Sequence, residues 1–216
     1  MKLLPEPPLT LLHLCGYGTL ATHSIALPGY PFATVIPYAL DAAHNPVLCI
    51  SALAEHTKNV LADPRVSLSV VQPGADDVQD TARLTLVADA ERFEPNEALR
   101  ARYLRYLPKT EDLLALDFMF FRLRPKRIRY IGGVGRMGWV EEADWAALPM
   151  LSTELEEQFL KDTRSQLSVQ VKLLGADCFG IDYEVKGERH RQRFPDAPLT
   201  AERFATAAPR FAAELC

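Results

Sequence analysis

A cluster of polar side chains follows an apolar run and could bind an anion. The run Val47–Ile50 ends at Ser51, and His56, Thr57 and Lys58 follow within a few positions. These residues offer hydroxyls, an imidazole and an ammonium group, and an adjoining helix N-terminus would add N–H groups without intrahelical acceptors. The cluster therefore predicts a phosphate-binding site. The alternative is that the hydroxyls cap a helix, that Lys58 is a solvated charge and that His56 is a surface histidine.

The flanking residues predict the elements that must position this cluster. The apolar run before it is typical of a strand, and Val60 and Leu61 after it belong to a short helix. Pro64 biases Asp63 away from helical dihedral angles, so the helix should end there after about two turns. Alternation resumes in Val66–Val70, which predicts the next strand. A helix this short is marginal by itself, so packing must stabilise it.

Motifs for metal or nucleophilic chemistry are missing from the sequence. The five histidines are far apart and form no H-E-x-x-H motif, and the four cysteines form no C-x-x-C pair, so no metal site built in one stretch is expected. The histidines are His13, His23, His44, His56 and His190. No G-x-S-x-G motif indicates a serine nucleophile. No catalytic residue can be assigned, and any difficult chemistry would be carried by a bound cofactor.

Five segments together resemble a known family. They are GTLATHS (Gly18–Ser24), PFATVIPYAL (Pro31–Leu40), SALAEHTKNVLADPRVSLSVV (Ser51–Val71), ARLTLVADAERF (Ala82–Phe93) and RIRYIGGVGRMGWV (Arg127–Val140). In order and spacing they resemble the pyridoxamine 5'-phosphate oxidase-like, FMN-binding split-barrel superfamily. The best match is its haem-utilisation (HugZ-like) branch, which carries a small C-terminal domain of unknown function.

The resemblance implies FMN as the cofactor and assigns residues to it. The phosphate would be met by Ser51, His56, Thr57 and Lys58, and the ring and ribityl chain would be bordered by the backbone of residues 34–37. Arg83 occupies a strand position that faces the flavin in relatives, and an ordinary outward arginine is the alternative reading. The implied cofactor-binding residues are Thr34, Val35, Ile36, Pro37, Ser51, His56, Thr57, Lys58 and Arg83.

Three functions fit this resemblance. The first is an FMN-dependent oxidoreductase that acts on a small-molecule substrate at a flavin site in a dimer interface. The second is a haem-binding or haem-degrading protein of the haem-utilisation type, and the third is a flavin-binding module without turnover. The C-terminal Arg/His substrate signature of strict pyridoxamine-phosphate oxidases is absent, so that particular substrate is not expected.

Expectations about partners follow from the fold and the composition. A barrel with an open side would expose apolar surface, so we expect a C2 homodimer with Arg136 and Trp139 near the site; Trp139 could equally be simple interface packing. A net charge of -4 and a pI near 5.8 argue against nucleic-acid binding. The basic run Arg122–Arg129 alternates with apolar residues and is interpreted as a solvated sheet face. The scattered cysteines and the lack of a membrane-length apolar segment indicate a cytoplasmic protein.

The predicted fold class is α+β, a split, antiparallel, Greek-key-like β-barrel followed by a small α+β domain. Residues 1–148 should form the barrel domain and residues 149–216 the C-terminal domain. In the barrel domain we expect a first helix over Pro8–Leu14, a helix between Pro95 and Tyr106, and last strands over Phe118–Leu123 and Arg127–Ile131. The run Gly132–Gly135 is not a dinucleotide-binding fingerprint, because it follows the last predicted strand and no helix opens after it.

The C-terminal domain should contain two helices and a hairpin. Helical character is predicted over Ser152–Leu174, becoming less regular after Gln166, and the hairpin is predicted over Cys178–Val185 and Glu188–Phe194. Thr200 should cap a final helix.

A departure from the family weakens the haem reading of this domain. In relatives, the first helix of this domain commonly carries a histidine-rich signature that includes an acidic residue. In this chain, Phe159–Asp162 occupies that position. His190, the one histidine in this half of the sequence, is interpreted as a surface residue, with a haem ligand as the alternative.

Overall fold

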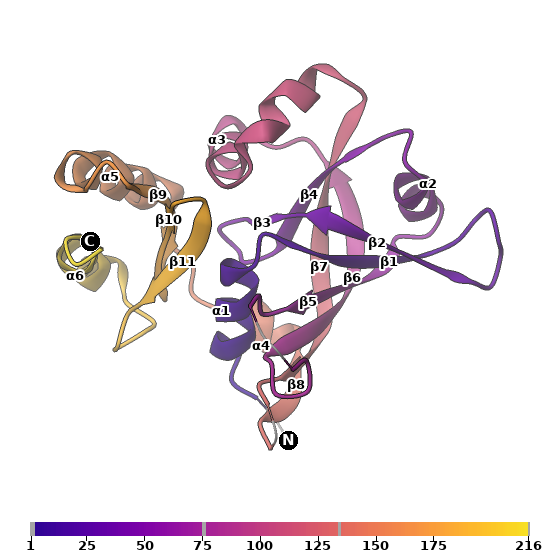
Figure 1. The fold of residues 1–216 in the computed structure, drawn as a ribbon, viewed down its shortest axis with the longest axis horizontal. Coiled ribbons are helices and arrows are strands. Elements are labelled where there is room, and N and C mark those ends of the chain that lie inside the picture. Colours follow the sequence, from indigo (N-terminus) through magenta and orange to yellow (C-terminus); the bar gives the residue numbers. More distant parts are fainter. Residues whose placement is uncertain (1–2, 75–76, 134, 216) are drawn as a thin grey trace. The chain divides into compact units, whose positions relative to one another are not determined.

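The chain folds into two compact units, residues 1–148 and 149–216, and each is described by itself (Figure 1). The structure is a computed structural model that describes residues 3–74, 77–133 and 135–215. Of the residues considered above, Val134 and Cys216 lie outside the described residues. No described helix is long and apolar enough to cross a membrane.

A curled antiparallel sheet forms the first unit. Its strands are β1 (Tyr17–His23), β2 (Pro31–Pro37), β3 (Ala39–Leu40), β4 (Pro46–Ser51), β5 (Arg65–Val71), β6 (Arg83–Phe93), β7 (Phe118–Ile131) and β8 (Met137–Glu141). The strand order is β2-β1-β5-β6-β7-β4-β3, and β8 pairs with β7. Helices pack around this sheet, so the α+β class with a split antiparallel barrel is confirmed (Figure 1).

The two faces of the sheet differ in polarity because side chains alternate along each strand. One row of paired residues crosses the inner face and is fully buried: Leu20, Leu68, Leu86, Ile128 and Val140. The next row crosses the outer face and contains Val35, Thr19, Ser69, Thr85, Arg129 and Trp139. We call this second set the outer row. Its members are exposed or half-buried, so the outer face is available for binding.

Helices close the first unit around the sheet. They are α1 (Glu6–Leu14), α2 (Glu55–Ala62), α3 (Glu97–Tyr106), the 3-10 helix η1 (Pro108–Ala115) and α4 (Glu142–Ala146). Leu9 and Leu12 of α1 are fully buried, and Tyr38 ties the end of α1 to the sheet by donating a hydrogen bond from its hydroxyl to the Leu12 carbonyl at 2.9 Å. In α3, Arg102 Nε donates to the Leu40 carbonyl at 2.9 Å. These bonds join the helices to the strand ends that they cover.

Two expectations about the end of the barrel are wrong. Phe118–Leu123 and Arg127–Ile131 are parts of one strand, β7, because the register against β6 shifts at Val87/Ala88 and leaves one extra residue on β7. Pro125 lies at this bulge, where a missing ladder donor is tolerated. The strand β8 was not predicted; it turns back on β7 after the glycine-rich run, with Gly132 N donating to the Arg136 carbonyl at 2.7 Å.

The second unit contains a three-stranded sheet and two long helices. Its elements are α5 (Thr153–Thr163), the 3-10 helix η2 (Arg164–Gln166), β9 (Val171–Asp177), β10 (Gly180–Val185), β11 (Glu188–Arg193) and α6 (Ala201–Ala212). The prediction of helical character as far as Leu174 is wrong, because Val171 begins a strand that pairs with β10. A register shift at Asp182/Tyr183 interrupts the alternation that would have identified this strand. Thr200 caps α6 as predicted, accepting a hydrogen bond from Arg203 N at 3.4 Å.

An ion cluster lies within the second unit's sheet. Arg191 on β11 donates to Asp182 on β10 at 2.6 Å and to Asp177 on β9 at 2.7 Å. The cluster therefore joins all three strands through one guanidinium. Next to it on β11, His190 stacks on Tyr183 with ring centroids 5.4 Å apart.

Candidate functional site

The helix α2 spans Glu55–Ala62, which is the predicted length of about two turns. Thr57 and Lys58 lie in its first turn. Ala54 is the N-cap residue and provides no side-chain hydrogen bond, and its carbonyl accepts hydrogen bonds from the N–H groups of Thr57 and Lys58. The N–H groups at the very start of the helix have no intrahelical acceptor. They are available to an anion.

Thr57 carries the strongest sign of a binding site. Its side chain is 0% exposed, and among the described residues no hydrogen-bond partner exists for its Oγ1. A buried hydroxyl without a partner destabilises a fold by about 1–3 kcal/mol. Such an atom is retained when a bound group completes its hydrogen bonding. A phosphate oxygen at the start of α2 would accept that hydrogen bond, so the residues present fit FMN.

The other predicted phosphate ligands lie near Thr57 in the chain but differ in environment. Ser51 Oγ, at the end of β4, accepts a hydrogen bond from Leu53 N at 3.2 Å. His56 is half-buried, and loss of solvation lowers its pKa below the ordinary value. Lys58 is exposed, and no carboxylate among the described residues pairs with it. The cluster thus presents one exposed positive charge, one imidazole and one buried hydroxyl.

Asn59 fixes this cluster to the sheet, and sequence reasoning did not identify it. Its side chain is fully buried; Nδ2 donates to Thr22 Oγ1 on β1 at 3.0 Å, and Oδ1 accepts from Ile25 N at 3.0 Å. The one signal in the sequence that could have identified Asn59 was its position beside the apolar residues of a short helix. Both ends of the amide bind the β1–β2 hairpin, so α2 keeps its position beside that hairpin (Figure 1).

The residues predicted to border the flavin ring lie on an edge strand. The strand β2 is at the end of the sheet order, and its outer edge pairs with no strand among the described residues. Thr34 and Ile36 point toward the core side, while Val35 and Pro37 point outward, and Val35 is 64% exposed. Backbone groups along this edge are therefore available to a ligand. That they contact one stays a prediction.

Arg83 is anchored by its own loop. Its Nη1 donates to the carbonyls of Val78 at 2.6 Å, Gln79 at 3.2 Å and Thr81 at 3.2 Å. The side chain therefore joins the start of β6 to residues 78–81 just before it. Contact between Arg83 and a cofactor stays a prediction.

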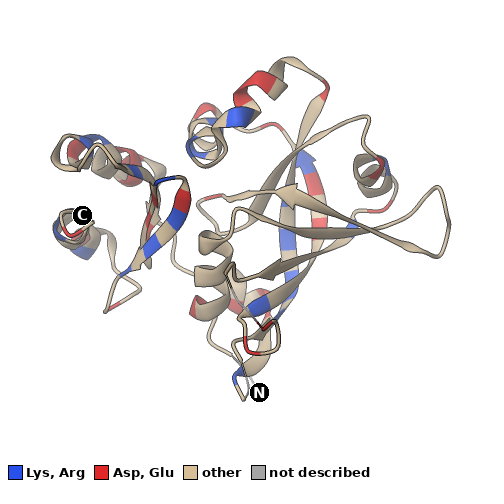
Figure 2. Ribbon diagram, in the orientation of Figure 1, with Lys and Arg blue, Asp and Glu red and all other residues tan. Residues whose placement is uncertain are grey.

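A second group of polar residues gathers around Trp139 on the outer face. The guanidinium carbon of Arg127 lies 4.1 Å from the indole centroid and that of Arg129 lies 5.3 Å from it. Arg127 also pairs with Glu141 at 2.9 Å, whereas no carboxylate pairs with Arg129 among the described residues. Arg136 is exposed in the β7–β8 turn. Figure 2 shows the basic residues along β7, while the β1–β2 hairpin has no charged residue.

The structure keeps these two groups apart within one chain. Val35 and Trp139 stand at opposite ends of the outer row, five strand spacings apart. At about 4.8 Å per spacing, the path along the curled sheet is roughly 24 Å. Figure 1 shows α2 beside the β1–β2 hairpin and β8 at a distant part of the first unit, so Arg136 and Trp139 do not join the α2 cluster in the same chain. A contribution from them to that site would require a second copy.

The sequence and the fold both match known proteins. Residues 8–132, more than half of the chain, match the family model described as pyridoxamine 5'-phosphate oxidase. The non-canonical heme oxygenase HOZ, chloroplastic, from Arabidopsis thaliana is 38% identical over 127 residues, which are 58% of this chain and 39% of that protein. The chain thus matches well under half of the length of that relative.

Two solved structures resemble the chain over nearly its whole length. A heme binding protein from Mycobacterium smegmatis has a TM-score of 0.63 and 29% identity, and the match covers 97% of this chain and 96% of that one. A protein of unknown function from Agrobacterium tumefaciens str. C58 has a TM-score of 0.73 and 23% identity, and the match covers 96% of this chain and 92% of that one. At this identity the match shows only that the two chains share a fold. Because the family model covers more than half of the chain, the chain belongs to the pyridoxamine 5'-phosphate oxidase-like split-barrel family.

Proposed function

We propose that the protein binds haem and supports its oxidative breakdown. The observation that carries this proposal is the 29% identity to a heme binding protein over 97% of the chain. The 38% identity to a heme oxygenase over 127 residues supports it independently. Haem then takes precedence over the FMN-dependent oxidoreductase that the sequence motifs favoured.

The outer face has the groups that haem needs. Tyr17, Val35, Val71 and Val87 are exposed apolar side chains on this face, and a porphyrin ring has two broad apolar surfaces to bury. Arg129 offers a guanidinium without a carboxylate partner among the described residues, which suits a haem carboxylate. The geometry thus combines apolar area with a cation.

An imidazole for the iron is present on the same face. His23 ends β1, shares its face with Tyr17 and is exposed. Imidazole is a common axial ligand of haem iron. His23 is three strands away from Arg129 in one chain, so in the proposed homodimer His23 would ligate the iron of a haem whose carboxylate is bound by Arg129 of the second copy. Haem itself would supply the oxygen chemistry, and the chain would bind and orient it and limit its access to water.

A C2 homodimer is part of this proposal. Exposed apolar side chains on one sheet face form a surface that a second copy would cover. A second copy would also bring its own Arg136 and Trp139 toward the α2 cluster, which one chain cannot do. The active unit would then hold two equivalent sites.

A titration with hemin tests the proposed function. Full-length protein prepared without haem should develop a sharp Soret band that saturates at one haem per chain, and ascorbate with oxygen should then bleach that band. A band that never saturates, or hemin that passes through gel filtration separately from the protein, would refute haem binding. Binding without bleaching would refute the breakdown step alone.

FMN remains a second candidate because of one observation. The buried Thr57 hydroxyl, without a partner among the described residues, lies at the start of a helix, where a phosphate fits. Quenching of flavin fluorescence by the haem-free protein would measure this binding. FMN should bind much more tightly than riboflavin, since riboflavin lacks the phosphate. Equal affinity for the two would refute the phosphate-binding site.

A further inference from the structure

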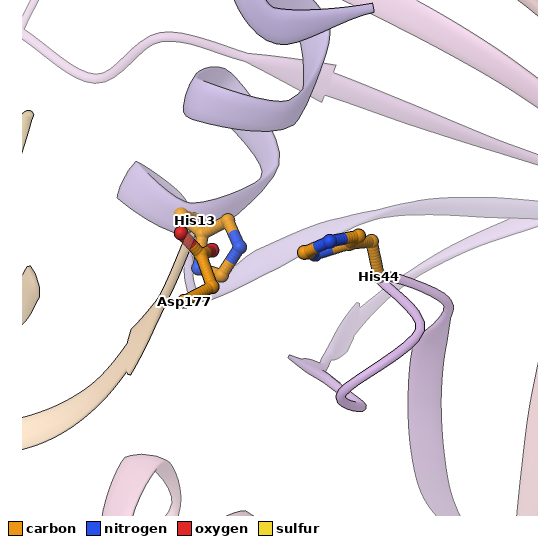
Figure 3. Close-up of side chains that lie close together, drawn as sticks. All are labelled: His13, His44 and Asp177. Carbon is orange, nitrogen blue, oxygen red and sulfur yellow. The ribbon is translucent and has the colours of Figure 1, made fainter. Parts of the chain in front are cut away.

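Two histidines from separate elements come together in the first unit, outside both sites described above. His13 lies on α1 and His44 lies in the turn between β3 and β4, and their ring centroids are 6.2 Å apart with an interplanar angle of 71° (Figure 3). One nitrogen of each ring lies within 4.8 Å of one nitrogen of the other. Both side chains are buried, at 2% and 1% exposure.

The turn that carries His44 is held in a constrained conformation. His44 has a φ of +63°, which is uncommon for a residue other than glycine. Asp41 Oδ1 accepts hydrogen bonds from Ala43 N and Asn45 N, both at 2.9 Å, and Asp41 Oδ2 pairs with Arg122 at 2.7 Å. Backbone strain that the surroundings maintain is a feature of functional sites. The ion-paired Asp41 thus fixes the backbone of the turn that carries His44.

The helix that carries His13 is equally well anchored. His13 lies in the last turn of α1, next to Leu12, whose carbonyl accepts the Tyr38 hydroxyl at 2.9 Å. Cys15 N closes the helix by donating to the Leu11 carbonyl at 3.1 Å. Both imidazoles therefore project from supported backbone, which is the arrangement that a preorganised ligand pair needs.

We propose that His13 and His44 form a binding site for a divalent late first-row transition-metal ion of the Zn²⁺ type. Neutral imidazole is the side chain that such ions prefer among nitrogen donors. Zn–N bonds of about 2.0–2.1 Å place two nitrogens of one tetrahedral ion roughly 3.4 Å apart, so small ring rotations would suffice to close the pair on an ion. Water or other ligands complete the coordination.

The pattern was invisible in the sequence for a physical reason. Motif reasoning finds ligands spaced along one helix or one turn, whereas this pair joins a helix to a hairpin turn. Neither His13 nor His44 belongs to the proposed haem or phosphate sites. The metal site can therefore be tested in protein that contains neither haem nor flavin, and its failure would leave the proposed function untouched.

Zn²⁺ competition against a chromophoric chelator tests the site. Untagged, full-length protein without haem should bind one Zn²⁺ tightly, and His13→Gln and His44→Asn should each weaken that binding at least about tenfold. Asparagine is chosen at position 44 because it tolerates a positive φ. The control variant His190→Gln should bind Zn²⁺ as the unchanged protein does. Unaltered binding in either site variant, or equal weakening in the control, would overturn the proposal.

A measurement on the unchanged protein keeps the test independent of how the variants fold. Cu²⁺ bound to the protein should give an electron paramagnetic resonance spectrum with superhyperfine splitting from two imidazole nitrogens. Zn²⁺ should also raise the thermal unfolding midpoint, because an ion that binds only the folded state stabilises it. A spectrum with one nitrogen or none would overturn the two-histidine site.

Discussion

Asn59 Nδ2 on α2 lies 3.0 Å from Thr22 Oγ1 on β1, and this contact fixes the helix to the barrel. Thr22 Oγ1 in turn donates to the Phe32 carbonyl on β2 at 3.3 Å. The chain of bonds therefore runs from the short helix through β1 to the edge strand that was predicted to border a cofactor. A helix of eight residues depends on such tertiary contacts, since its own nucleation is unfavourable.

Replacing Asn59 should test how much this contact stabilises the fold. Asn59→Ala removes both amide hydrogen bonds and should lower the free energy of unfolding by about 2–3 kcal/mol, measured by urea denaturation. Thr22→Val also removes two hydrogen bonds, the one accepted from Asn59 and the one donated to the Phe32 carbonyl, so it should cost a similar amount. In a double-mutant cycle, the two changes should show a coupling energy of about 1 kcal/mol. Strict additivity would contradict a direct contact.

Thr57→Val separates a binding hydroxyl from a structural one. Valine keeps the volume and removes a buried hydroxyl that has no partner among the described residues, so the ligand-free protein should be unchanged in stability or slightly more stable. FMN binding should weaken by up to about tenfold. A clear loss of ligand-free stability would show instead that the hydroxyl stabilises the fold.

Lys58→Ala tests the charge beside that hydroxyl. Lys58 is exposed, so its removal should leave the unfolding of the ligand-free protein nearly unchanged. A hydrogen bond to a charged group contributes about 1.5–3 kcal/mol, so FMN affinity should fall roughly 10- to 100-fold. Riboflavin affinity should not change, and this is the internal control. An equal loss of affinity for FMN and riboflavin would show that Lys58 does not bind the phosphate.

His56 should make stability depend on pH in a defined direction. Burial lowers the pKa of His56 in the folded chain below its ordinary value of 6.5, so the unfolded chain binds the proton more readily. The contribution of neutral His56 to the free energy of unfolding is complete above about pH 6.5. It is lost as the pH falls below that value and through the lower pKa of the folded chain. Urea unfolding at several pH values should show this decline, and His56→Gln should reduce it. An unchanged decline in the variant would show that other groups cause it.

The parts of the fold that were predictable are those with local signals. The short helix that stops before Pro64 and the cap at Thr200 both depend on residues within a few positions, and both were found. The strand β9 was missed because it carries a bulge at Leu174, which breaks its alternation. A bulge shifts the register by one residue, so the side chains after it point to the opposite face of the sheet. The simple apolar–polar alternation that identifies a strand is then lost.

The site was less predictable because it depends on register. Val35, Thr85 and Arg129 are far apart in the sequence and lie in one row only when five strands, β2, β1, β5, β6 and β7, pair in the observed alignment. Motif resemblance identified the α2 cluster, whose residues are close together in the chain. It could not show that Thr57 would be buried without a partner among the described residues or that Asn59 would bind the hairpin, since both depend on the packing of α2.

Arg129 offers the sharpest test of the outer face as a haem site. It lies beside Trp139 and has no carboxylate partner among the described residues, while Arg127 on the same strand pairs with Glu141. Arg129→Gln should therefore weaken hemin binding roughly 10- to 100-fold, and Arg127→Gln, the matched control, should have a smaller effect. Hemin dimethyl ester, which lacks the carboxylates, should bind the Arg129→Gln variant as well as the unchanged protein. If both forms of hemin lost affinity equally, Arg129 would be packing against the ring and not pairing with its carboxylates.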